Sequence, residues 1–144
     1  MSKKSRSEGN RVAMAIKANK SDYYISDVDL EDNYGDILSA GISVRKTLGK
    51  NQSAFLLISA GTKNLNIYVD TKDKDISSED WLNSSISSIS SEKQIEVNGD
   101  ISSVSIEIEY PFKLKDVVRG SAFAFLRKNG LLEEESEEDE YFDF

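Results

Sequence analysis

The chain has 144 residues, of which 18 are basic and 26 are acidic, and its formal net charge is −8. It contains neither cysteine nor histidine, which excludes disulfides, thiol nucleophiles, Cys/His zinc sites and histidine-dependent catalytic triads. A chain of this length with 38% hydrophobic residues can bury one core, so we expect a single α+β domain. Because the commonest general base is missing, we expect no enzymatic activity and no cofactor.

The first ten residues are small, polar and basic, and we expect residues 1–10 to form a disordered basic arm. No apolar run follows their lysines, and no stretch approaches the roughly 20 apolar residues of a membrane span. These features predict a cytoplasmic protein whose globular domain covers residues 11–130. Residues 11–18 alternate apolar with other side chains and favour a strand, although their alanines also permit a helix.

An acidic patch follows two adjacent tyrosines and consists of Asp27, Asp29, Glu31, Asp32 and Asp36. Its spacing is similar to that of a calcium loop. It lacks the glycine at the sixth position and the glutamate at the twelfth that such a loop requires, so we predict no metal site. Residues 36–48 are compatible with a short helix or a strand, since Gly41 weakens a helix.

Two hairpins are predicted. Residues 54–60 form a continuous apolar run typical of a buried strand, and residues 65–71 alternate after a turn that contains Gly61 and Asn64. Asn98 and Gly99 mark a second hairpin turn, and the alternating residues that follow predict a strand with one face toward solvent. Pro111 ends that strand.

Two short helices are predicted, near residues 78–90 and 116–128. Ser77 or Ser78 can cap the first, and Asp116 and Gly130 can cap the two ends of the second. The predicted fold is therefore a mostly antiparallel sheet of about five or six strands with two short helices, between a disordered basic N-terminus and an acidic C-terminus.

Basic residues lie near aromatic residues that could stack on the bases of a single strand. Trp81 and Phe55 are more typical of a core, because large aromatic side chains usually fill cores. Tyr23 and Tyr24 are adjacent, so in a strand one of them should point outward. The predicted nucleic-acid-binding residues are Lys17, Lys20, Tyr23, Tyr24, Arg45, Lys46, Lys50, Lys63 and Tyr68.

The segment 131–144 is predicted to be an acidic, solvated tail. Eight of the residues 133–144 are acidic, and removing these eight from the total of 26 leaves 18 acids against 18 basic residues. The tail therefore carries the whole net charge. Its closing aromatic residues are unfavourable in water and indicate a partner's pocket. The predicted partner-binding residues are Glu137, Glu138, Asp139, Glu140, Tyr141, Phe142, Asp143 and Phe144.

This tail resembles the acidic, Phe-terminated tip of bacterial and phage single-stranded DNA-binding proteins, whose tips dock into basic pockets of replication and repair proteins. The resemblance covers about twelve residues, and Phe142-Asp143 stands where the bacterial tip has Ile-Pro. It implies a non-enzymatic single-stranded DNA-binding protein of a bacterium or a phage-infected cell, in which the tail competes with DNA and recruits replication or recombination partners. The sequence does not decide whether the nucleic acid is DNA or RNA, or whether the protein is a monomer or a homodimer.

Two alternatives remain from the sequence. One is a protein-interaction module, or an inhibitor whose acidic tail mimics nucleic acid and occupies a basic groove. The other is a metal-dependent enzyme that uses carboxylates, for which the acids between Asp27 and Asp36 are the candidate cluster.

Overall fold

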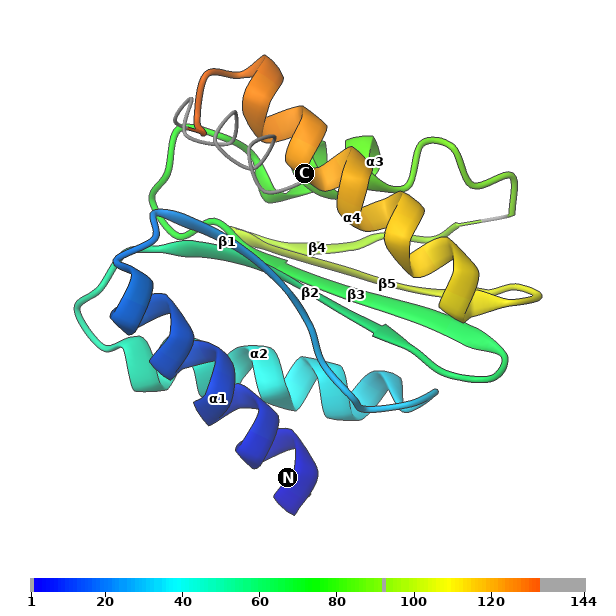
Figure 1. The fold of residues 1–144 in the computed structure, drawn as a ribbon, viewed down its shortest axis with the longest axis horizontal. Helices are drawn as coiled ribbons and strands as arrows, with labels where there is room; N and C mark the ends of the chain where they lie inside the picture. Colours follow the sequence, from blue (N-terminus) through cyan, green and yellow to red (C-terminus); the bar gives the residue numbers. More distant parts are fainter. Residues whose placement is uncertain (1, 92, 133–144) are drawn as a thin grey trace, which may run out of the picture.

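A five-stranded sheet lies between two layers of helices (Figure 1). The structure is a computed structural model that describes residues 2–91 and 93–132. The helices α1 and α2 cover one face of the sheet, and α3 and α4 cover the other. In chain order the elements are α1 (Lys3–Asn19), β1 (Tyr23–Asp27), α2 (Tyr34–Leu48), β2 (Ala54–Ala60), β3 (Asn64–Asp70), α3 (Ser78–Ser85), β4 (Glu96–Asn98), β5 (Ile101–Glu107) and α4 (Pro111–Lys128).

The strand order is β1-β2-β3-β5-β4. The predicted α+β class and the five strands are confirmed, and all neighbouring strands are antiparallel except β1 and β2. Those two are parallel because α2 returns the chain to the end at which β1 began. Both predicted hairpins are present. In the second, Asn98 pairs with Ile101, so Gly99 and Asp100 form the loop, one position later than predicted.

The prediction of a disordered arm is wrong, because α1 begins at Lys3, and residues 11–18 adopt the helix that the sequence left as the alternative to a strand. Ser2 caps this helix, its hydroxyl accepting a hydrogen bond from the Ser5 N–H at 3.0 Å. The buried residues Ser5, Gly9, Val12, Ala13 and Ile16 recur at helical spacing. Met14, which completed the apparent alternation, is 61% exposed on the opposite side of the helix.

The ambiguous segment 36–48 belongs to α2, which Asn33 caps by accepting from the Asp36 N–H at 3.0 Å. Gly41 lies inside this helix because the ring of Tyr68 on β3 occupies the space that a Cβ would fill. The glycine that weakened the helix prediction thus serves the packing of α2 against the sheet.

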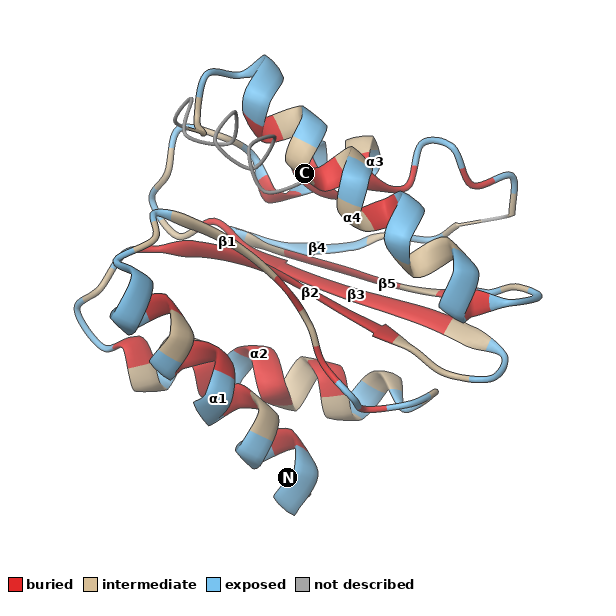
Figure 2. Cartoon of the chain, in the orientation of Figure 1, coloured by how far each residue is buried: buried red, intermediate tan, exposed pale blue. Residues whose placement is uncertain are grey.

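The sheet separates two cores (Figure 2). Trp81, Leu82 and Leu126 pack on the α3 and α4 side, and Ile16, Ile37 and Phe55 pack on the α1 and α2 side. On the predicted solvent-facing side of β5, Ser103 is buried and Ser105 is half-buried, and only Glu107 at the end of the strand is exposed, so helices cover most of this side.

The two predicted helices are present, with different bounds. Pro111 starts α4 five residues earlier than expected, because the missing N–H of a proline is no loss in the first turn. Residues 2–91 and 93–132 contain four helices where two were predicted for the chain. Within the described residues, none of these helices is long and apolar enough to cross a bilayer.

Candidate functional site

Four exposed lysines lie at or just beyond the C-terminal ends of α1 and α2. α1 and α2 lie side by side, with the Thr47 hydroxyl donating to the Asn10 side chain at 3.3 Å, and their C-terminal ends lie at the same end of the molecule (Figure 1). Lys17 and Lys20 follow one helix to its end, and Lys46 and Lys50 follow the other. All four side chains are exposed, and we call this set the lysine surface.

Backbone caps fix the ends of both helices. Lys20 adopts a left-handed conformation with φ of 52°, and its N–H bonds the carbonyls of Ile16 and Lys17. Gly49 has φ of 59° and ψ of −115°, and its N–H bonds the carbonyls of Arg45 and Lys46 at the end of α2. The hydroxyl of Ser53 donates to the carbonyl of Ser21 at 2.5 Å. This bond ties together the two loops that follow α1 and α2.

Two predicted residues, Arg45 and Tyr68, are unavailable to a nucleic acid. Tyr68 is buried, with its ring stacked on Phe55 at a centroid distance of 6.2 Å, and burial raises its pKa far above the ordinary value. Arg45 points inward and binds the buried carboxylate of Asp70 at 2.9 Å. Helix packing over this face of the sheet is the reason that both predictions are wrong.

Tyr23 and Tyr24 are both half-buried, so the expectation that one of them points outward is wrong. Tyr23 packs edge-on against Trp81 at 6.2 Å, and Lys74 lies 5.3 Å above its ring. Burial raises the pKa of the Tyr23 hydroxyl. Tyr24 packs against the core on the other face. Because helices cover both faces of the sheet, only the margins of these rings reach solvent.

Lys63 is exposed in the turn between β2 and β3, at the end of the sheet opposite to the lysine surface. It lines a cavity of about 740 Å³ together with Glu107 and Glu109. The structure therefore does not bring Lys63 together with the four lysines.

The last described residues lie beside the lysine surface. Leu131 and Leu132 line a cavity of about 280 Å³ with Lys20, Asp22 and Tyr23. The acidic run that begins at residue 133 is thus attached next to Lys20. The predicted partner-binding residues 137–144 lie outside the described part of the chain.

β1 forms an edge of the sheet, and no described strand pairs with its second side. The Ala54 N–H donates to the Asp22 carbonyl and the Val28 N–H donates to the Ile58 carbonyl, both at 2.8 Å. In a parallel ladder, alternate residues bond the same neighbour. The N–H and C=O groups of Tyr23, Ile25 and Asp27 therefore point away from β2, and we call them the open edge.

Charged side chains surround the Asp27 end of the open edge. The guanidinium of Arg11 donates to the Asp27 carbonyl at 2.7 Å, which confirms the outward direction of that group. Lys115 and Arg119 from α4 pair with the Asp27 carboxylate, the lysine at 3.2 Å.

A cavity of about 380 Å³, which we call the β1 cavity, lies at this end of β1. It is lined by Glu8, Arg11, Asp27, Val28, Asp29, Ala60, Phe112 and Lys115. The ring of Phe112 is 68% exposed and lies 4.1 Å from the Lys115 ammonium.

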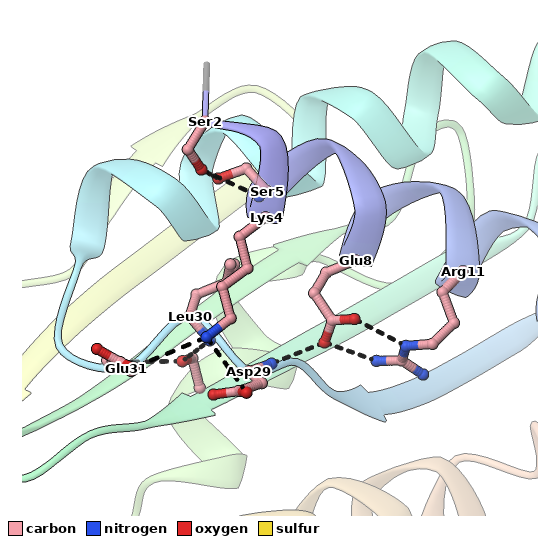
Figure 3. A network of polar contacts seen from close by, with 9 residues as sticks. Ser2, Lys4, Ser5, Glu8, Arg11, Asp29, Leu30 and Glu31 are labelled. Atoms are coloured by element: carbon pink, nitrogen blue, oxygen red, sulfur yellow. Dashed lines mark hydrogen bonds and ion pairs between the residues drawn. The ribbon is translucent and has the colours of Figure 1, made fainter.

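The first turns of α1 hold the segment after β1 by polar contacts (Figure 3). Glu8 accepts from the Asp29 N–H at 2.8 Å and from Arg11, whose hydrogen bonds lower the pKa of the Glu8 carboxyl. Lys4 lies 3.3 Å from Asp29 and 3.7 Å from Glu31. Sequence reasoning missed Arg11, Lys115 and Arg119, because only the fold brings α1 and α4 to the same end of β1.

The acidic residues between Asp27 and Asp36 do not act together, because they contact different partners. Asp27 binds α4, Asp29 and Glu31 face Lys4, and Asp32 accepts from the Lys63 N–H at 3.0 Å and the Asn64 N–H at 2.8 Å in the β2–β3 turn. Among the described residues, no three acidic side chains converge as a metal site would require. The patch therefore gives no support to a carboxylate metal centre.

Asp32 should make the stability depend on pH in the acid range. Hydrogen bonds, first that from the Lys63 N–H and then those from Thr62 and Asn64, lower its pKa to about 2. The stabilisation is present above the ordinary pKa of an aspartate and is lost as the pH falls through the folded value. Asp32→Asn should flatten the decline of the melting temperature between about pH 4 and 2. Asp116→Asn, on the exposed face of α4, controls for the loss of a charge, and equal profiles for the two variants would contradict this role.

Comparison of the chain with protein-family models and with curated proteins finds no match.

Proposed function

We propose that this protein binds single-stranded DNA through the lysine surface and catalyses no reaction. Its acidic segment, residues 133–144, competes with the strand for the same lysines and recruits replication or recombination proteins once the strand displaces it. The observation that carries the proposal is that Lys17, Lys20, Lys46 and Lys50 are all exposed at the C-terminal ends of two neighbouring helices, which lie at the same end of the molecule.

Charge dominates the proposed contact. Lysines bind phosphates as point charges and release counterions, so each phosphate that is neutralised adds about 0.7 to the salt dependence of binding to a single strand. The tyrosines contribute little stacking, because Tyr23 and Tyr24 expose only their margins and Tyr68 is buried. Binding should therefore depend strongly on salt and weakly on base sequence.

The position of the acidic segment supports the competition. Its attachment beside Lys20 places a polyanion within reach of all four lysines. A segment tethered by a few residues acts at an effective concentration in the millimolar range, so individually weak contacts are sufficient. A long strand displaces it because many phosphates can replace its carboxylates.

The test is fluorescence anisotropy with a labelled oligothymidine across a salt series, for the full chain and for a truncation that ends at Leu132. The truncation should bind at least tenfold more tightly at low salt. Replacing Lys17, Lys20, Lys46 and Lys50 with glutamine should lower the slope of log affinity against log salt by about 3.

The matched control replaces four other exposed cations with glutamine, namely Lys63, Lys113, Arg127 and Lys128. Equal losses of affinity in the two fourfold variants would show that overall charge, and not the lysine surface, drives binding. No binding by any form would exclude the nucleic-acid function.

The open edge of β1 favours a second candidate, a protein-interaction module. Unpaired strand edges accept extended peptides through main-chain hydrogen bonds. In this function the truncation ending at Leu132 does not bind DNA, and the acidic segment acts on a partner's basic groove as a nucleic-acid mimic. The anisotropy measurement on the truncation therefore separates the two candidates.

A further inference from the structure

We propose that the open edge of β1 is the docking site of residues 140–144 of the same chain, which add to the sheet as a sixth strand. The proposal concerns the aromatic end of the acidic segment, and it stands independently of nucleic-acid binding at the lysine surface.

The open edge lacks the features that usually protect a sheet edge. Exposed edges tend to carry lysine, proline or a bulge, or to be very short. The opposite edge follows this rule, because β4 has only three residues. β1 has the sequence Tyr-Tyr-Ile-Ser-Asp and pairs in regular register with β2 over all five residues. The outward N–H and C=O groups of Tyr23 and Ile25 are thus available to a sixth strand, whereas the Asp27 carbonyl already accepts from Arg11.

A cavity lies at each end of the open edge. The β1 cavity flanks Asp27, and the cavity that contains Leu131 and Leu132 flanks Tyr23. Both cavities hold charges of both signs, with Arg11 and Lys115 beside Glu8, Asp27 and Asp29 at one end and Lys20 beside Asp22 at the other. The fit of an added strand to this edge therefore depends on its main chain and its apolar side chains and not on net charge.

Residues 140–144 read Glu-Tyr-Phe-Asp-Phe and fit this edge in length and composition. They match the five residues of β1, and aromatic residues favour strands. The rings of Tyr141, Phe142 and Phe144 would then lie beside Tyr23 and Ile25 or near Phe112. In that position they would lose much of their exposure to water. The preceding acidic run has low strand propensity and would serve as a linker.

The linker is long enough. Residues 133–139 can span roughly 23 Å when extended, whereas the five residues of β1 cover about 17 Å. Leu132 lies at the Tyr23 end of the edge, so residues 140–144 can reach it in either direction. A second copy of the chain is a weaker occupant, because a five-residue edge alone buries less than the roughly 1,000 Å² that a stable interface needs. The tethered segment has no such requirement, owing to its millimolar effective concentration.

Amide hydrogen exchange measured residue by residue by NMR tests the proposal with an internal control. The Ile25 N–H points to the open edge, while the N–H groups of Tyr24 and Ser26 point to β2. Only an added strand protects Ile25. We compare the full chain with a full-length variant in which Tyr141, Phe142 and Phe144 are serine, which keeps every charge of the segment. The Ile25 amide should exchange at least tenfold more slowly in the native chain, with Tyr24 and Ser26 within about twofold.

Three results would overturn the proposal. Equal exchange at Ile25 in both proteins would show that the segment leaves the edge open. Protection retained in the triple-serine variant would show that the aromatic residues are not required. Protection that grows with protein concentration would assign the edge to a second copy. Failure of DNA binding would leave the Ile25 result unchanged, so the two proposals can fail separately.

Discussion

Replacing Arg45 with methionine should lower the free energy of unfolding by about 3–5 kcal/mol, because Asp70 would remain buried without its cation. The Asp70 side chain is 3% exposed, and Arg45 holds it at 2.9 Å. The same guanidinium donates to the carbonyls of Asn51 at 3.2 Å and Ser53 at 2.8 Å. It lies 5.2 Å from the Phe55 ring, so several contacts are lost together. Urea unfolding followed by circular dichroism measures the effect.

Two variants separate the buried ion pair from charge in general. Lys46→Met, at the next and exposed position of α2, should change stability by less than about 0.5 kcal/mol. Adding Asp70→Asn to Arg45→Met should recover about 1–2 kcal/mol, because the uncompensated charge is removed. A change below about 1 kcal/mol for Arg45→Met alone would be inconsistent with the pair as described.

Gly41→Ala should destabilise the protein by about 3 kcal/mol, although alanine is the better helix former. A Cβ at this position would lie well inside the van der Waals contact distance of three atoms of the Tyr68 ring. The ring cannot turn aside freely, since it is buried and stacked on Phe55. Either α2 moves away from the sheet or the tyrosine leaves its position, and both responses open the core.

Gly120→Ala is the matched control for this prediction. Gly120 lies in α4, and nothing stands within 4 Å of a Cβ built there. The same substitution should therefore raise the free energy of unfolding by about 0.5–1 kcal/mol through helix propensity alone. Thermal unfolding of the two variants should move in opposite directions. A shift of the same sign would mean that contact with Tyr68 does not decide the effect.

The elements with strong local signals could be predicted from the sequence. The apolar run of β2, the alternation along β5 and the glycine-marked turns gave the hairpins within a residue or two. The first helix could not be predicted in this way, because Val12, Met14 and Ile16 fit both a strand and the side of a helix. The capping hydroxyl of Ser2 is a signal for a helix, but several serines near it, including Ser5 and Ser7, make the capping residue hard to recognise.

The candidate site shows the same division between local and tertiary information. Lys17, Lys20, Lys46 and Lys50 could be proposed as exposed cations from composition, but their position at the ends of α1 and α2 could not. The burial of Arg45 and Tyr68 could not be foreseen, because both depend on α2 lying over β3. The open edge of β1 required the strand order, which no local pattern contains.

The position of the single tryptophan makes the two helical layers distinguishable by spectroscopy. Trp81 is fully buried on the α3 and α4 side, where its indole N–H donates to the Ala122 carbonyl at 3.2 Å. Its fluorescence reports the packing of that layer, while far-ultraviolet dichroism registers all four helices. If α1 and α2 separate from the sheet first, dichroism falls while the emission maximum stays in place. If the fluorescence and dichroism transitions coincide, the layers on the two faces of the sheet unfold together as one cooperative unit.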